Sequence, residues 1–220
     1  MGRPREHDER TAAALLDAAE RTIQQQGVES LSVRHLADDV GTTTRAVYSL
    51  FGSKDGLLAA LGARAFDLLR SALQDLPVTS DPGGDLVDAA CTVFRRFATT
   101  HPTLFHVGFK RDLVAPELAA QFEAARLSAL AALEGRMSRL KQAGQLGDRP
   151  VNDALSHFHA LCEGLADMEL RGALPAGRED EIWRDAVSVL VAGFSAPRPK
   201  RRRSGPLTVP GTTVSVHRRT

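Results

Sequence analysis

Five neighbouring side chains between residues 43 and 49 can all donate hydrogen bonds: Thr43, Thr44, Arg45, Tyr48 and Ser49. Hydroxyl and guanidinium groups of this kind bind phosphate oxygens and the edges of bases. Arg34 precedes the group and Lys54 follows it. Lys54 stands where a new helix can begin, so a cation and free backbone N–H groups would together favour a phosphate. These residue types point to recognition of nucleic acid.

Two short helices joined by a tight turn would hold these side chains outward. Four apolar residues are spaced to meet between such helices: Leu36, Val40, Val47 and Leu50. Ala37 is small where the second helix would cross the first, and Gly41 can adopt the positive φ that the turn needs. Ser32 is placed to cap the first helix, Thr42 or Thr43 to cap the second, and Ser53 to cap the helix that follows. The spacing predicts a helix-turn-helix at residues 33–52, with the second helix at 43–50.

The charge of the whole chain does not by itself indicate a nucleic-acid-binding protein. The net charge of the 220 residues is +1, but seven of the 28 basic residues lie in 197–220, which hold no acidic residue. The remainder sets 21 basic against 27 acidic residues. A DNA-binding surface must therefore be local. The alternative, two packed helices without a DNA role, is opposed by the polar outer face of the second helix.

The remaining pattern predicts an all-α protein in several parts. We expect a flexible basic arm at 1–10, carrying Arg3, Arg5 and Arg10, then the helix-turn-helix domain at 11–52 and a connecting helix at 53–76. A loop at 77–84, with Pro82-Gly83-Gly84, separates these from a larger helical domain at 85–195. Residues 196–220 are rich in Pro, Arg, Lys, Gly and Thr, and we expect a disordered basic tail. It would be a solvated end, a source of additional phosphate contacts, or a localisation signal.

Residues 31–58 resemble the DNA-binding domain of TetR-family repressors. The stretches that carry the resemblance are LSVRHLADDVG at 31–41 and AVYSLFGSKDGLL at 46–58, and the most specific markers are Tyr48, Phe51, Lys54 and the pair Leu57-Leu58. The detailed match covers residues 11–60, and beyond it only the all-helical layout is similar.

The resemblance assigns roles by position. Helix 43–50 would enter the major groove of double-stranded DNA. Thr43, Tyr48 and Lys54 would contact phosphate, Thr44 and Arg45 would face bases, and Arg34 could also reach a base. Two positions depart from the family pattern. Thr42 replaces a usual apolar residue of the turn, and Leu50 replaces a common phosphate-binding histidine, so no contact is assigned to Leu50.

The resemblance further implies a homodimeric repressor on a palindromic operator, released by an unknown small-molecule effector. The helices near 151–172 and 179–195 would form the dimer interface. Gly164 lies in mid-helix and indicates a close backbone approach, either at that interface or at a crossing within one subunit. Aromatic residues at helical spacing are typical of plain core, but a pocket lined by them would favour a mostly apolar ligand. The candidate pocket residues are Phe94, Phe97, Phe105, His106, Phe109, Phe122, Phe158 and Trp183.

Other chemistries find little support in the sequence. We expect no catalytic residues, no cofactor and no metal site, because no nucleophile has a recognisable base and the histidine pairs lack helical ligand spacing. No apolar stretch is long enough to cross a membrane, and the N-terminus does not resemble a signal peptide, so we expect a cytoplasmic protein, and the resemblance implies a bacterial one. Two alternatives stay open: a helical interaction module and a small helical enzyme, each without a DNA role.

Overall fold

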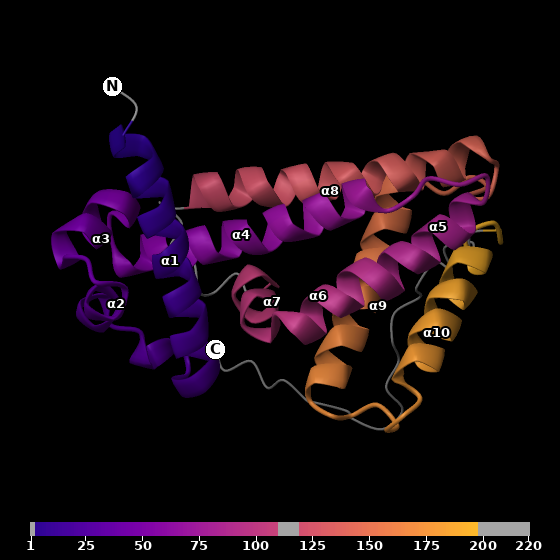
Figure 1. Cartoon of the computed structure of the whole chain (residues 1–220). Helices are drawn as coiled ribbons and strands as arrows, with labels where there is room; N and C mark the ends of the chain where they lie inside the picture. Colours follow the sequence, from indigo (N-terminus) through magenta and orange to yellow (C-terminus); the bar gives the residue numbers. More distant parts are fainter. Residues whose placement is uncertain (1–2, 110–118, 198–220) are drawn as a thin grey trace, which may run out of the picture.

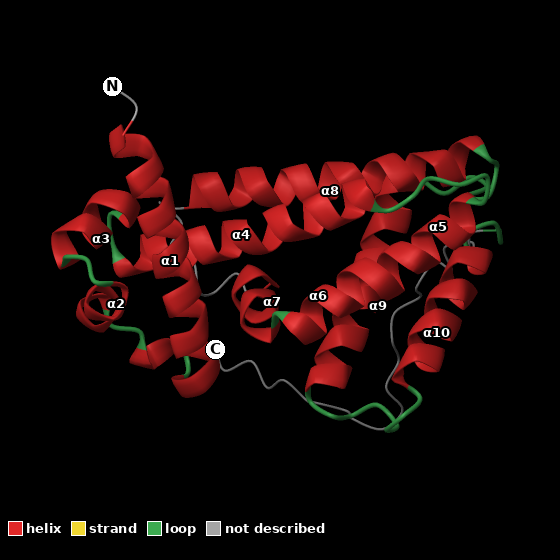
Figure 2. Cartoon of the chain, in the orientation of Figure 1, coloured by secondary structure: helices red, strands yellow, loops and turns green. Residues whose placement is uncertain are grey.

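The computed structural model describes residues 3–109 and 119–197, and within these ranges every regular element is a helix (Figures 1 and 2). The elements in chain order are α1 (Arg3–Gln26), η1 (Val28–Ser30), α2 (Val33–Val40), α3 (Thr44–Phe51), α4 (Lys54–Asp75), α5 (Pro82–Asp88), η2 (Ala89–Phe94), α6 (Arg95–Thr100), α7 (Pro102–Phe109), α8 (Ala119–Gln142), α9 (Val151–Leu170) and α10 (Glu179–Gly193). The predicted all-α class and the helix-turn-helix followed by a larger helical domain are confirmed.

Two helix starts differ from the sequence prediction. Helix α1 begins at Arg3, so residues 3–10, expected as an arm, are helical. The physical reason is that Pro4 is tolerated in a first turn and residues 5–10 contain no helix breaker. Helix α5 begins at Pro82, within the expected loop, because the Asp81 carboxylate accepts from the Gly83 amide at 3.1 Å and Pro82 fits the first helical position.

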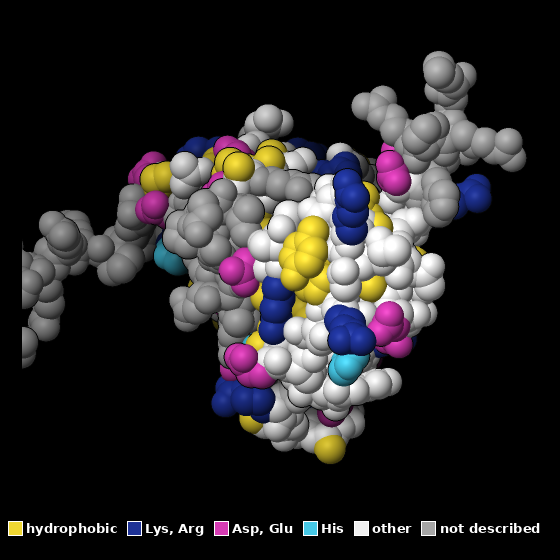
Figure 3. Space-filling view, turned by 90° about the vertical axis from the view of Figure 1, so that its left-hand side faces the viewer, with side chains coloured by type: hydrophobic (Ala, Val, Ile, Leu, Met, Phe, Trp, Pro, Cys, Tyr) yellow, Lys and Arg dark blue, Asp and Glu magenta, His cyan; other side chains and the backbone are white. Residues whose placement is uncertain are grey.

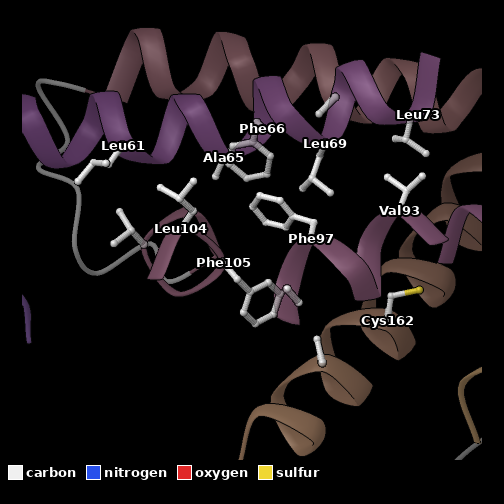
Figure 4. Close-up of a cluster of buried hydrophobic side chains, with 14 of the residues drawn as sticks. Leu61, Ala65, Phe66, Leu69, Leu73, Val93, Phe97, Leu104, Phe105 and Cys162 are labelled. Atoms are coloured by element: carbon white, nitrogen blue, oxygen red, sulfur yellow. The ribbon is translucent and has the colours of Figure 1, made fainter. Parts of the chain in front are cut away.

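Helix α4 is a long helix that connects the two ends of the molecule. It starts at the helix-turn-helix and runs beside α8 to the opposite end of the chain (Figure 1), a length of roughly 33 Å at 1.5 Å per residue. Its buried Leu61, Phe66 and Leu69 face Phe97 of α6 and Leu104 of α7 (Figure 4). One hydrophobic core therefore continues from the helix-turn-helix into the C-terminal domain.

Two glycines let neighbouring helices approach α4 closely. A Cβ on Gly62 would lie 2.6 Å from ring atoms of Phe122 in α8. A Cβ on Gly108 of α7 would lie 3.0 Å from the Cβ of Ala65. Both distances are shorter than ordinary carbon contacts. Helix α7 thus packs directly against α4, so a shift of α7 would also move α4.

The far end of α4 is closed by arginines from α8. The buried Arg136 guanidinium donates to the carbonyls of Leu73 at 2.7 Å and Leu76 at 2.5 Å, which are among the carbonyls a helix end leaves without partners. Arg139 donates to the buried carboxylate of Asp85 at 2.5 Å. The Thr79 hydroxyl donates to the same carboxylate at 2.6 Å. These contacts hold the 76–81 connection against both α5 and α8.

A polar network joins the last helices. Helix η2 is a π-helix, and Arg95 follows it directly. The Arg95 guanidinium donates to both carboxylate oxygens of Glu169 on α9 at 2.8–3.0 Å and pairs with Asp180. The fully buried Trp183 of α10 donates its indole N–H to Glu169 at 2.7 Å. Trp183, proposed above for a pocket, is therefore a core residue with a satisfied polar group.

The remaining predictions concern the last two helices, the C-terminal tail and membrane spans. The predicted helices 151–172 and 179–195 are present as α9 and α10, which end at Leu170 and Gly193. Most of the predicted basic tail, 198–220, lies outside the described residues. In the ranges that are described, no helix is long and apolar enough to cross a membrane.

Candidate nucleic-acid interface

Three side-chain caps set the directions of the helices at the DNA-binding end. The Ser32 hydroxyl accepts from the amide of His35 at 3.5 Å at the start of α2. Thr43 accepts from the amide of Ala46 at 3.1 Å and begins α3. Ser53 accepts from the amide of Gly56 at 2.9 Å and begins α4. The predicted caps at Ser32 and Ser53 are confirmed, and of the two candidates for α3 the cap is Thr43.

The wedge between α2 and α3 is built as the spacing predicts. Leu36, Ala37 and Val47 are each 1% exposed, and Val40 and Leu50 pack partly buried against them. Gly41 has a φ of 71° and ends α2 in the left-handed conformation, which other residues adopt only at a cost. The turn therefore fixes which face of α3 is turned outward.

The predicted DNA-contacting side chains lie on that outward face. Arg34, Thr43, Thr44, Arg45 and Ser49 are exposed, Tyr48 is 52% exposed, and Lys54 is half-buried at the first turn of α4. About half of Tyr48 is thus open to solvent and available for contact with a partner. Figure 3 looks onto this end of the molecule, where Lys and Arg side chains surround a small hydrophobic patch.

The cations of this face differ from most of those in α4 and the C-terminal domain. Within the described chain, Arg34, Arg45 and Lys54 form no ion pair or hydrogen bond. By contrast, every described Lys and Arg between residues 61 and 197 except Arg96 contacts a carboxylate or a backbone carbonyl. The helix-turn-helix thus presents uncompensated positive charge, although the body of the protein is acidic.

The sequence analysis missed two features of this interface. A Cβ on Gly56 would lie 1.8 Å from the carbonyl oxygen of Phe51, so α3 and α4 can meet only if residue 56 is glycine. A hollow of about 480 Å³ separates the start of α1 from α3 and is lined in part by Asp8, Thr11, Arg45 and Ser49. The pattern of residues 11–60 gave no signal for this hollow, because the α1 residues that line it lie more than thirty positions from α3 in the sequence.

Two polar contacts tie α1 to the rest of the molecule, one to α4 and one to the C-terminal domain. Arg64 of α4 pairs with Asp17 at 2.6 Å. The imidazole of His101, just before α7, lies 3.2 Å from the carboxylate of Glu20. Together with the Gly108 contact to α4, these contacts join α7 to both long helices of the DNA-binding end.

An open groove of about 770 Å³ lies between α7 and α9. Of the predicted pocket residues, Phe105, His106 and Phe109 line it. Phe94 does not, but its ring packs against those of Phe105 and Phe109, with centroids 6.0 and 5.4 Å away. The other predicted aromatic residues are buried away from the groove, in the core: Phe97, Phe122, Phe158 and Trp183. Its α9 wall, which the sequence analysis did not predict, includes Glu163, Gly164 and Asp167.

Two family models match the chain. Residues 15–61 match bacterial regulatory proteins of the tetR family, and residues 87–190 match the tetracyclin repressor-like C-terminal domain. The chain belongs to the TetR family. Helices α1–α3 are therefore the helix-turn-helix DNA-binding domain of a TetR-family regulator, and the helices from α5 onward are its C-terminal domain.

One curated relative and several solved structures are similar to this TetR-family chain. The nicotine-responsive transcriptional repressor HdnoR of Paenarthrobacter nicotinovorans is 36% identical over 72 residues, which cover 33% of this chain and 36% of that protein. A Rhodococcus protein of unknown function has a TM-score of 0.75 at 24% identity and covers 84% of this chain and 95% of its own. FadR of Bacillus subtilis, solved with stearoyl-CoA, has a TM-score of 0.68 at 16% identity and covers 82% and 98%. At these identities the two structures support the fold alone.

Proposed function

We propose that this protein is a transcriptional repressor that binds a palindromic DNA operator as a homodimer in the bacterial cytoplasm. The observation that carries the proposal is the set of unpaired cations Arg34, Arg45 and Lys54 beside the exposed Tyr48 on a capped helix-turn-helix. In this proposal α3 enters the major groove, Arg45 and Thr44 read bases, and Lys54 holds a backbone phosphate. A regulatory role of this kind requires no catalytic residue.

The dimer interface is proposed on the outer faces of α9 and α10. A Cβ added to Gly164 would meet nothing within 4 Å in the described part of the chain, which supports contact with a second copy over a close crossing inside one subunit. Val189 of α10 is 65% exposed, and Met168 of α9 is 40% exposed. A second copy would cover these apolar side chains, and the two reading helices would match half-sites about 34–36 Å apart or at a multiple of that spacing.

An effector in the α7–α9 groove would act through α7. One side of α7 lines the groove with Phe105 and Phe109, and its other side buries Leu104 and Val107 and crosses α4 at Gly108. A ligand that shifts α7 would therefore tilt α4, whose first turn holds Lys54. Such a ligand lowers DNA affinity only if it prefers the tilted conformation.

The proposal is tested by DNase footprinting of the purified protein on the region upstream of its own gene. At low salt we expect one protected stretch with two-fold symmetric sequence. Tyr48→Phe should weaken binding to all sites alike, because it removes a phosphate contact and keeps the ring. No protection at any salt concentration, from protein that is folded by circular dichroism, would contradict the proposal.

A further inference from the structure

The α7–α9 groove combines aromatic walls with a carboxylate that pairs with no Lys or Arg of the described chain. The rings of Phe105 and Phe109 stack with centroids 4.9 Å apart and an interplanar angle of 27°. Glu163 and Asp167 are one turn apart on the opposite wall, on α9. A volume of about 770 Å³ falls within the range of small-molecule sites. The groove is therefore roomy enough for an organic ligand and has two kinds of recognition group.

The two carboxylates differ in their partners. Asp167 is paired at 2.6 Å with Arg171, which also lines the groove, so these two opposite charges compensate each other. For Glu163, the one basic group within ion-pair distance in the described chain is the imidazole of His159, at 3.6 Å. Burial lowers the pKa of His159, and this outweighs the opposing effect of Glu163, so the imidazole is mainly neutral near pH 7. Glu163 is thus a negative charge at the groove that no cation among residues 3–109 and 119–197 compensates.

The neutral imidazole does not line the groove but packs against Phe109, which does. The ring of His159 lies 5.5 Å from that of Phe109, centroid to centroid. The negative face of an aromatic ring attracts a cation, and a nearby carboxylate adds direct Coulomb attraction. An apolar ligand would use the rings alone, and an anionic ligand would be repelled by Glu163.

We infer that the groove binds an organic cation, a protonated amine on an aromatic or apolar body, with the ammonium beside Glu163 and the body against Phe105 and Phe109. This inference rests on the proposed role of the groove as the effector site. It replaces the mostly apolar ligand expected from the sequence by one that carries a positive charge.

The test uses probes that share one shape and differ in charge. The first set of three probes is benzylamine, benzyl alcohol and benzoate. The second set is 1-naphthylmethylamine, 1-naphthylmethanol and 1-naphthoate. Binding to the full chain without DNA is measured by titration calorimetry. In at least one set the amine should bind about tenfold more tightly than the alcohol, and the carboxylate should not bind. Equal affinity for amine and alcohol, or no binding by any amine, would overturn the inference.

Variants then locate the charge. Glu163→Gln should reduce the affinity for the amine to that for the alcohol, and Glu134→Gln, which changes an exposed glutamate on α8, should leave both affinities unchanged. Phe109→Leu should weaken the amine and the alcohol together. An amine preference that survives Glu163→Gln would remove Glu163 from the site. Because calorimetry is done without DNA, a missing footprint would contradict the proposed repressor function and would not affect the ligand-binding result. In the same way, a failure of the amines to bind would contradict the organic-cation site and would not affect the footprint.

Discussion

The carbonyl oxygen of Phe51 occupies the space that a side chain on Gly56 would need, since a Cβ built there lies 1.8 Å away. Gly56→Ala should therefore force α3 away from α4. We expect loss of specific DNA binding together with destabilisation of the protein, measured by mobility shift and by thermal unfolding.

Gly135→Ala provides the matched control for Gly56→Ala. Gly135 is exposed within α8, and a Cβ there meets nothing within 4 Å. The change should raise the free energy of unfolding by roughly 0.5–1 kcal/mol, since alanine favours a helix more than glycine does. If Gly56→Ala behaves like this control, the tight junction between α3 and α4 is wrong.

Arg45 and Lys54 should fail in different ways if they have the proposed roles. Arg45→Ala should cost roughly 1–3 kcal/mol on the operator and relax the preference at one base pair. Lys54→Gln should weaken binding to operator and random DNA alike and lower the slope of log affinity against log salt by about one. Mobility shifts on both DNAs at several salt concentrations measure this, and identical behaviour of the two variants would contradict the assignment.

Glu169 holds two partners that are otherwise without acceptors in the interior. Glu169→Ala would leave the Trp183 indole N–H and most of the Arg95 guanidinium unpaired, since Glu169 is 12% exposed and Trp183 is fully buried. We expect a loss of about 3 kcal/mol in the free energy of unfolding. Trp183 is the one tryptophan of the chain, so its fluorescence in urea reports the transition directly. A loss no larger than that of Glu134→Ala would show that the network is not important.

The contribution of Asp85 to stability should depend on pH. Burial alone would raise the pKa of this carboxyl, but hydrogen bonds from Thr79 and Arg139 outweigh it and lower the pKa below the ordinary 3.8. A group with a lowered pKa in the folded state stabilises the protein fully above its unfolded value and loses that contribution as the pH falls through the folded value.

The stability difference between wild type and Asp85→Asn is therefore expected to be roughly 2 kcal/mol at pH 7 and to shrink below pH 3.8. Urea unfolding of both proteins across this range measures it. A difference that grows on acidification would mean that the carboxyl is protonated in the folded state.

A substitution at Gly164 should distinguish an effect on the stability of the subunit from an effect on the stability of the dimer. Because the described chain leaves open space at this position, Gly164→Leu should not destabilise the subunit. Gly164 lines the α7–α9 groove and also lies one turn before the exposed Met168 of the proposed interface, where the added side chain should raise the dissociation constant of the dimer by at least about tenfold, since close packing tolerates little added volume. Sedimentation at a series of concentrations measures it, and an unchanged dimer would place the interface elsewhere.

The features that were predicted from the sequence depend on residues close together in the chain. The caps at Ser32 and Ser53, the glycine turn at Gly41 and the exposed ring of Tyr48 follow from local spacing, because helical periodicity and turn chemistry act over a few residues. The family resemblance rests on the same short stretch. Of the predicted pocket residues, Phe105 and Phe109 line a groove, whereas Phe97 and Trp183 are in the core. Periodicity shows that a side chain is turned inward, but it does not show which residues that side chain contacts.

The sequence by itself determined that the chain is all-helical and that Arg45, Tyr48 and Lys54 project from a helix-turn-helix. Only the tertiary structure decided that α1 begins at Arg3, that Gly56 must be glycine and that Glu163 lies across the groove from Phe105 and Phe109, with no Lys or Arg of the described residues paired to it. The physical reason is that charge compensation and close approach are relations between atoms brought together by folding. Glu163 lies 58 positions from Phe105, and no local pattern records whether a cation lies beside it.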